Sequence, residues 1–180
     1  MAYFPLSIDL SGKTVFLVGN GVQIQEKKEK LALFSPNIVC LSDLCEADLD
    51  VKPVLVIVGD MEEQDAERIS RLCVERNIPV NVVDVPRLCT FFFPALITCG
   101  DLTISVSTGG KSPAAAAYLR RQMEKALPDQ TEEILRWLGE NRTRLRNMGI
   151  LGDAVAVAFE KNRPLSEKEC RELSDKKSDR

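Results

Sequence analysis

The first structural signal in the chain is the segment Thr14-Val-Phe-Leu-Val-Gly-Asn-Gly21. Its apolar and β-branched residues follow the turn-forming pair Ser11-Gly12 and end at a second turn that contains two glycines. A short apolar run between two turn signals predicts a fully buried strand, as in a parallel sheet. From Gln23 to about Phe34 the pattern becomes helical, and Pro36 limits this helix.

The same alternation of strand and helix continues along the chain. Further strands are predicted at residues 37–41, 54–58 and 80–83, and a helix is predicted at residues 62–76. Strands that alternate with helices predict a doubly wound parallel sheet. The predicted fold class is therefore α/β, with a Rossmann-like sheet.

Beyond Pro86 the pattern changes. Residues 102–107 alternate between apolar and polar side chains, which predicts a half-exposed strand. Ser112 is a good N-cap and Pro113 suits the first helical position. A helix is therefore predicted over residues 114–126.

The last part of the chain is predicted to be helical and then highly charged. Two glutamates follow Thr131 in the first turn of a predicted helix, and Ile134, Leu135 and Leu138 share one face of it. From Glu160 onward, charged and polar residues dominate. This composition indicates either a solvated helix or a disordered tail.

The 180-residue chain contains no histidine. This excludes every mechanism in which imidazole is the base, the partner of a nucleophile or a metal ligand. The six cysteines include no C-x-x-C pair, so neither a zinc ribbon nor a disulfide scaffold is predicted. Chemistry must come from carboxylates, amines, thiols or a bound cofactor.

The overall composition, 44% hydrophobic and 28% charged, is typical of a soluble globular protein. A net charge of −3 argues against nucleic-acid binding, which requires a basic face. No apolar run approaches the roughly 18 residues of a membrane span, and residues 1–10 lack the layout of a signal peptide. We expect a cytoplasmic protein with no membrane partner.

Gly19 and Gly21 form the beginning of a dinucleotide fingerprint, G-x-G-x-x-G/A. The first glycine permits a tight turn, the second lets a pyrophosphate approach the backbone, and the following helix points its N-terminus at the anion. The third position is Ile24, whose branched side chain must push the helix outward or be repacked. The alternative is a purely structural turn.

Asp43 lies just beyond the second predicted strand. A carboxylate there can accept a hydrogen bond from the adenosine ribose of NAD and would repel the 2′-phosphate of NADP. The alternative is that Asp43 is one of several acidic residues in a polar loop.

Gly59, Asp60 and Asp84 also follow predicted strands. Ligands of open α/β sheets bind outside the carboxyl ends of the strands, so these residues are expected to border one crevice with the glycine turn. A carboxylate there can act as a general base or bind a hard cation. The alternative role for Asp84 is that of a turn residue.

The segment Thr108-Gly-Gly-Lys-Ser112 is similar to part of a P-loop, but Thr103 stands where that motif requires its first glycine. No nucleoside triphosphate site is predicted. A glycine-rich, lysine-bearing turn at a helix N-terminus can still bind a carboxylate or a phosphate.

Several motifs follow one another in a fixed order. They are Tyr3-Phe-Pro-Leu6 with Asp9-Leu10, Val18-Gly-Asn-Gly21 with Lys27, Asn81-Val-Val-Asp84 with Pro86, Phe93-Pro94, and Ile104-Ser-Val-Ser-Thr-Gly-Gly-Lys-Ser-Pro113. Together they resemble the precorrin-2 dehydrogenase / sirohydrochlorin ferrochelatase family, the N-terminal module of siroheme synthase. The resemblance spans about residues 1–146, with a shorter stretch between Leu41 and Val54 that omits a strand and a helix of the family.

The resemblance implies a domain organisation. An NAD-binding Rossmann-like domain is expected at residues 1–100, a dimerisation segment at 101–128, a small helical domain at 129–160 and a charged tail at 161–180. It also implies a homodimer that oxidises precorrin-2 to sirohydrochlorin with NAD. In bifunctional members of the family, ferrous iron is then inserted to give siroheme.

The resemblance also assigns residues. Asp84 matches the catalytic aspartate of the family, and one carboxylate with NAD as hydride acceptor needs no imidazole. Cofactor contacts are predicted at Gly19, Asn20, Gly21, Val22, Gln23, Ser42, Asp43, Gly59 and Asp60. Substrate contacts are predicted at Asn81, Ser107, Thr108, Gly109, Lys111, Ser112 and Arg120, and no metal ligand is assigned.

Two alternative functions follow from Ile24 and the shortened stretch. One is a chelatase without NAD binding, and the other is a tetrapyrrole carrier or docking protein without catalysis. All three functions require local positive charge, because the tetrapyrroles carry many carboxylates. Candidate cations are Lys111, Arg120, Arg121, Arg142, Arg144 and Arg146.

Overall fold

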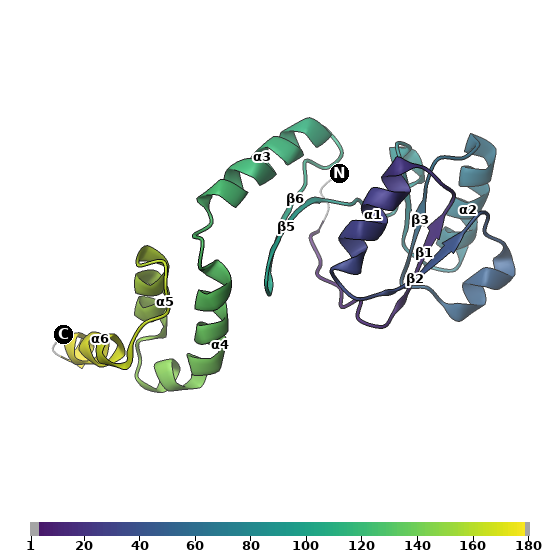
Figure 1. Cartoon of the computed structure of the whole chain (residues 1–180). Coiled ribbons are helices and arrows are strands. Elements are labelled where there is room, and N and C mark those ends of the chain that lie inside the picture. The colour runs from purple at the N-terminus through teal and green to yellow at the C-terminus, as the bar shows by residue number, and fades with distance from the viewer. Residues whose placement is uncertain (1–3, 179–180) are drawn as a thin grey trace. The chain divides into compact units, whose positions relative to one another are not determined.

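The computed structural model describes residues 4–178 (Figure 1). Tyr3, which belongs to one of the matched motifs, and residues 179–180 of the predicted tail lie outside the described residues. The chain divides into two compact units, and the division falls between Phe93 and Pro94. This division is earlier than the border predicted at residue 100, and the later borders stay predictions.

The first unit is built on a four-stranded parallel sheet. Its strands are β1 (Thr14–Val18), β2 (Asn37–Leu41), β3 (Leu55–Val58) and β4 (Val80–Val82), each within one residue of its predicted bounds. The strand order is β2-β1-β3-β4, and every neighbouring pair is parallel. The predicted α/β fold class is confirmed.

Helices α1 (Val22–Ala32) and α2 (Glu63–Glu75) cover opposite faces of this sheet (Figure 1). Successive side chains of a strand point to opposite faces. Accordingly, Leu17 of β1 lies in the core under α1, whereas Val18 lies in the core under α2. Both side chains are fully buried, as expected in a central parallel strand.

The connection between β2 and β3 contains one short 3₁₀ helix, η1 (Glu46–Val51). Leu44 and Leu49 of this connection are buried in the same core as Ile69 of α2, so it still covers that face of the sheet. No further strand or α-helix is inserted here, and the shortening relative to the family stays a prediction. As a result, β2 lies at one edge of the sheet.

The other edge, β4, is covered by the residues that follow the 3₁₀ helix η2 (Pro86–Leu88). The Thr90 hydroxyl accepts a hydrogen bond from the Val80 amide at 2.8 Å. The Cys89 thiol accepts one from the Val82 amide at 3.2 Å. Because an uncovered edge strand presents unpaired backbone groups, these side chains complete the sheet on this side.

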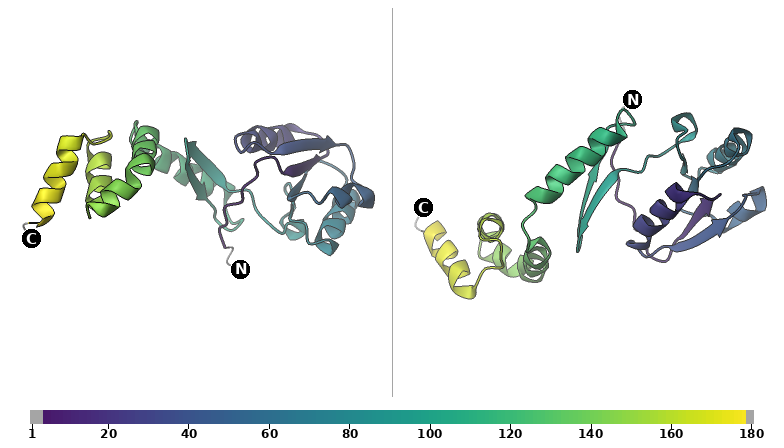
Figure 2. Two further views of the ribbon diagram at one scale, coloured as in Figure 1. Left: turned by 90° about the horizontal axis from the view of Figure 1, so that it is seen from below. Right: turned by 45° about the horizontal axis from the view of Figure 1, so that its top comes forward.

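The second unit begins with a hairpin of β5 (Ala95–Cys99) and β6 (Leu102–Val106), which pair antiparallel. Helix α3 (Pro113–Ala126) lies beside this hairpin (Figures 1 and 2). The predictions of β6 and α3 are confirmed, and the Ser112 hydroxyl caps α3 by accepting from the Ala115 amide at 3.1 Å. No strand is predicted at β5, although this segment is a short apolar run between Pro94 and Gly100.

Three more helices complete this unit: α4 (Thr131–Asn147), α5 (Leu151–Glu160) and α6 (Glu167–Ser178). Of the two alternatives predicted for the charged segment, a helix is the one observed over the residues of α6. Because this segment is mostly charged, its composition does not indicate that Leu165 and Cys170 are buried. They are 5% and 1% exposed in the core of the helices. Within residues 4–178, no helix combines the length and apolar character that crossing a bilayer requires.

Glu169 fastens α6 to the turn that precedes it. Its carboxylate accepts hydrogen bonds from Lys161 Nζ at 2.5 Å, Arg163 Nη2 at 2.7 Å and the Ser166 hydroxyl at 2.9 Å. The Arg163 and Lys161 side chains, followed by the Ser166 amide and hydroxyl, hold the pKa of Glu169 well below its ordinary value of 4.5. The charged carboxylate is therefore the form that stabilises the helical unit.

Replacing Glu169 by Gln should destabilise this unit at neutral pH but not in strong acid. The pKa of Glu169 is lower in the folded chain, so its contribution is complete above pH 4.5 and is lost as the pH falls through the folded-state value. Thermal unfolding followed by circular dichroism should show a difference between the two proteins that shrinks below pH 4.5. Glu172→Gln is the control, because Glu172 makes only an exposed 3.9 Å pair with Lys168. A difference that does not depend on pH would contradict this role.

Candidate cofactor and catalytic site

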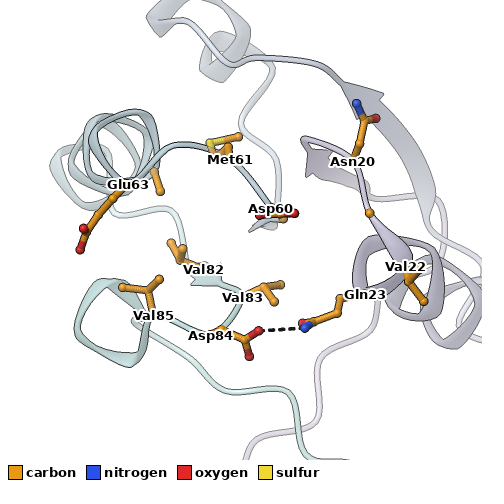
Figure 3. Close-up of a pocket in the computed structure, with 13 residues that line it drawn as sticks. Asn20, Val22, Gln23, Asp60, Met61, Glu63, Val82, Val83, Asp84 and Val85 are labelled. Carbon is orange, nitrogen blue, oxygen red and sulfur yellow. Dashed lines mark hydrogen bonds between the residues drawn. The ribbon is translucent and has the colours of Figure 1, made fainter.

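A pocket of about 530 Å³ opens at the carboxyl ends of β1, β3 and β4 (Figure 3). The strand order reverses between β1 and β3, because β2 pairs with one side of β1 and β3 with the other. Open α/β sheets bind their ligands at such a switch point. The predicted residues that line the pocket are Asn20, Gly21, Val22, Gln23, Gly59, Asp60 and Asp84.

The turn after β1 is shaped for close approach of a ligand. Gly19 and Gly21 have φ angles of +88° and +110°, which residues with a side chain rarely adopt. A Cβ on Gly19 would lie only 3.3 Å from Met61 Cε. Among the described residues, no side chain caps the N-terminus of α1, so its first amides remain for an anion. These residues fit a pyrophosphate group.

Ile24 packs directly over Gly59, at the end of β3. A Cβ added to Gly59 would lie 2.3 Å from Ile24 Cγ1 and 2.9 Å from the Asn20 carbonyl oxygen. The small residue that the fingerprint requires on the helix is thus supplied by the neighbouring strand end. Of the two outcomes expected for Ile24, repacking is the one observed, and Ile24 is 7% exposed.

Asp84 faces the N-terminus of α1 across the pocket. Gln23 Nε2 donates a hydrogen bond to Asp84 Oδ2 at 2.8 Å, and Figure 3 shows the two side chains pointing toward each other. Asp84 has a φ angle of +59°, which aspartate tolerates better than most residues. The Cys89 thiol donates to the Val82 carbonyl at 3.2 Å and lies 3.5 Å from that of Val85, so it secures both ends of this turn.

Lys27 of α1 lies near the same turn. Its Nζ is 4.9 Å from the centre of the Phe93 ring, in a cation–π contact. Burial and the charge of Lys30 lower the pKa of Lys27, whereas Cys89 and Asp84 act in the opposite direction. Lys27 is not among the predicted site residues, although its helical spacing from the buried side chains of α1 is a signal that could have found it.

Ser42 and Asp43 follow β2 but are not among the residues that line the pocket. The Asp43 carboxylate is paired with Arg68 of α2, with Nη2 and Oδ1 2.5 Å apart. The Arg68 hydrogen bond holds the pKa of Asp43 below its ordinary range, with a smaller contribution from the Leu44 amide. The contact of Asp43 with a ribose stays a prediction.

Asn81, a predicted substrate contact, is only 5% exposed in β4. Its Nδ2 donates to the Phe91 carbonyl at 3.1 Å, and among the described residues its Oδ1 has no hydrogen-bond partner. Asn81 therefore anchors Phe91 to the sheet. Within the described part of the chain, no group of three or more cysteine and carboxylate side chains could hold a metal ion.

The remaining predicted substrate residues belong to the second unit, around the N-terminus of α3. The Thr108 hydroxyl accepts from the Ser112 amide and donates to the Ser112 carbonyl, both at 3.1 Å. The Gly109 amide donates to the Ser107 hydroxyl at 3.2 Å. Their roles stay predictions, as do those of the two cationic residues, Lys111 and Arg120.

A glycine turn at a topological switch point, with the Asp84 carboxylate across the pocket, defines a protein that binds a dinucleotide on a Rossmann-type sheet. A family model described as putative NAD(P)-binding matches residues 6–95, which is the part of the chain that forms this pocket. A second model, described as sirohaem biosynthesis protein central, matches residues 100–126. The chain belongs to the precorrin-2 dehydrogenase / sirohydrochlorin ferrochelatase family.

Known relatives agree with this family. The siroheme synthase of Thioalkalivibrio sulfidiphilus is 34% identical over 149 residues, which are 71% of this chain and 30% of that protein. The siroheme synthase of a Psychrobacter species is 31% identical over 167 residues, 82% of this chain and 34% of that protein. This chain thus spans about a third of the length of these relatives.

A solved structure shares the fold. SirC, a precorrin-2 dehydrogenase, matches 99% of this chain and 100% of its own chain with a TM-score of 0.63, at 16% sequence identity. At this identity, the match concerns the fold alone.

Substituting Gly59 by Ala should force α1 away from the sheet. The new Cβ would overlap Ile24 and the Asn20 carbonyl, and overpacking of this kind costs about 1–3 kcal/mol. Because Ile24→Ala removes one of the two overlaps, the double variant should be less destabilised than the sum of the single variants. Urea unfolding of the four proteins tests this coupling.

Gly139→Ala is the matched control for this substitution. Gly139 lies within α4 with nothing near its Cβ position, so alanine there should leave stability unchanged or raise it by up to about 1 kcal/mol. Strictly additive effects at Gly59 and Ile24 would contradict the close contact.

Proposed function

We propose that this chain oxidises precorrin-2 to sirohydrochlorin with NAD, as a homodimer. The observation that carries the proposal is the 2.8 Å hydrogen bond between Gln23, at the start of α1, and Asp84, after β4. It places a carboxylate beside the turn that fits a pyrophosphate. Membership of the family and the likeness to siroheme synthases support the choice of substrate.

The residues of the site divide the chemistry between them. When bound, NAD supplies the acceptor for the hydride that leaves the substrate. The Asp84 carboxylate takes the proton that leaves with it, so no histidine is required. Gln23 holds that carboxylate at one oxygen and leaves the other for the substrate.

The charges of the substrate require cations near Asp84. Lys27 is half-buried against Phe93 and is attracted by the charge of Asp84, which makes it a candidate for binding a substrate carboxylate. We propose further carboxylate contacts at Lys111, at the glycine turn before α3, and at Arg120. Insertion of ferrous iron stays a prediction for this chain.

The homodimer has support from α3. Tyr118, Leu119 and Met123 are 55%, 46% and 47% exposed on this helix. Large exposed apolar side chains that gather on one element are typical of an interaction surface. We propose that they belong to the dimerisation segment.

Incubation with precorrin-2 and NAD, followed by absorbance, tests the dehydrogenase directly. Asp84→Asn preserves the size of the side chain and tolerates the left-handed backbone, so the fold should be retained. Loss of the general base should reduce turnover by about 100-fold or more, without changing the affinity for NAD beyond a few-fold.

Asp129→Asn is the control for this measurement, because Asp129 is an exposed residue of the turn before α4. It should turn over at the wild-type rate. Turnover that survives Asp84→Asn would refute the role of Asp84. Tight binding of sirohydrochlorin with no turnover by the wild type would instead identify a carrier.

A further inference from the structure

The ion pair of Asp43 and Arg68 joins the end of β2 to α2. Arg68 Nη2 lies 2.5 Å from Asp43 Oδ1, and Nη1 donates to the Leu44 carbonyl at 2.8 Å. Two such contacts hold the guanidinium in a fixed orientation. The Arg68 side chain is 33% exposed, and that of Asp43 is 65% exposed. The pair is therefore rigid and yet open to a ligand.

The position of this ion pair in the sheet suggests which part of a bound dinucleotide it would contact. The Gly19 amide donates to the carbonyl of Leu41, the last residue of β2, at 2.8 Å. The end of β2 thus lies beside the turn that fits the pyrophosphate. In dinucleotide-binding sheets, the adenosine ribose lies at this strand end, where a carboxylate selects a 2′-hydroxyl and an arginine accommodates a 2′-phosphate. This chain carries both groups in contact with each other.

We propose that Arg68 is a specificity-determining residue, and that Asp43 controls it. Asp43 accepts the ribose 2′-hydroxyl of NAD and at the same time occupies the guanidinium that would bind the 2′-phosphate of NADP. Arg68 in turn orients the carboxylate. The inference rests on the proposed function, since it assumes that a nicotinamide dinucleotide binds at this sheet edge.

The charges around Arg68 favour this arrangement. Asp65, one turn earlier on α2, lies 3.5 Å from Arg68 Nη2, so the pair with Asp43 is the shorter contact. With both carboxylates present, the guanidinium carries no excess positive charge toward a ligand. When the Asp43 carboxylate is removed, Asp65 alone leaves part of the guanidinium fork open to a phosphate.

Equilibrium binding of NADH and NADPH, followed by nucleotide fluorescence, tests the proposal without a need for turnover. The wild type should bind NADH more tightly than NADPH. Asp43→Asn should shift the ratio of the two dissociation constants toward NADPH by about tenfold or more, the size expected for one charge-assisted contact. Asp43→Ser is the second variant, should the first fold poorly.

The double variant Asp43→Asn/Arg68→Gln distinguishes the contribution of Arg68 to NADPH binding from that of Asp43. If Arg68 provides the phosphate contact, its removal should abolish the gain in NADPH affinity. If the gain persists without Arg68, or if Asp43→Asn and Asp43→Ser leave the ratio unchanged, the inference is overturned. In both cases the binding of NADH still supports the proposed function.

A second ion pair provides the matched control. Arg76, which directly follows α2, contacts Glu46 of η1, with Nη2 and Oε1 2.8 Å apart, so it also joins the β2–β3 connection to the end of α2. Glu46→Gln breaks this pair farther along α2 and should leave the NADH-to-NADPH ratio unchanged. A shift of the same size in Glu46→Gln would assign the effect to the connection as a whole and overturn the role of Arg68. A wild type that binds neither nucleotide would overturn the proposed function and this inference together.

Discussion

The contact of Ile24 with Gly59 determines where α1 begins relative to the end of β3. A glycine at position 59 removes the one side chain that would keep the helix away from the strand. The backbone of the glycine turn after β1 can then cross the end of the strand, where Asn20 and Asp60 form an isolated bridge. The position of Gln23 depends on the same contact, since it precedes Ile24 on the helix. Through the Gln23 hydrogen bond, the position of the Asp84 carboxylate depends on it as well.

The sheet could be predicted because its signals are local. Each of the four parallel strands is a short apolar run bounded by turn formers, and such a run needs no knowledge of its neighbours to be found. The hairpin strand β5 carries the same signal, an apolar run between Pro94 and Gly100, although no strand is predicted there. The helix α6 is difficult to predict from its composition, because among its described residues only Cys170 is buried and most of the others are charged or polar. Burial there is decided by tertiary packing.

The site could be predicted only where a motif fixes it. Gly19, Gly21, Gly59, Asp60 and Asp84 follow strands, and parallel strands bring their carboxyl ends to one edge of the sheet. Ile24 contacts Gly59, and Asp43 pairs with Arg68, so both contacts are between residues far apart in sequence. Contacts of this kind depend on the distance between a helix and a strand, which no periodicity encodes.

Because the chain contains no histidine, the charges in the site come from lysine and carboxylate side chains. The chain has a net charge of −3, yet the turn after β4 has Lys27 on one side, held against the face of the Phe93 ring. Burial lowers the pKa of this lysine, and the negative charge of Asp84 offsets part of that effect. A half-buried ammonium group is retained where a ring face and a carboxylate both attract it. The local attraction between Lys27 and Asp84, and not the net charge of the chain, therefore sets the electrostatic surroundings of this carboxylate.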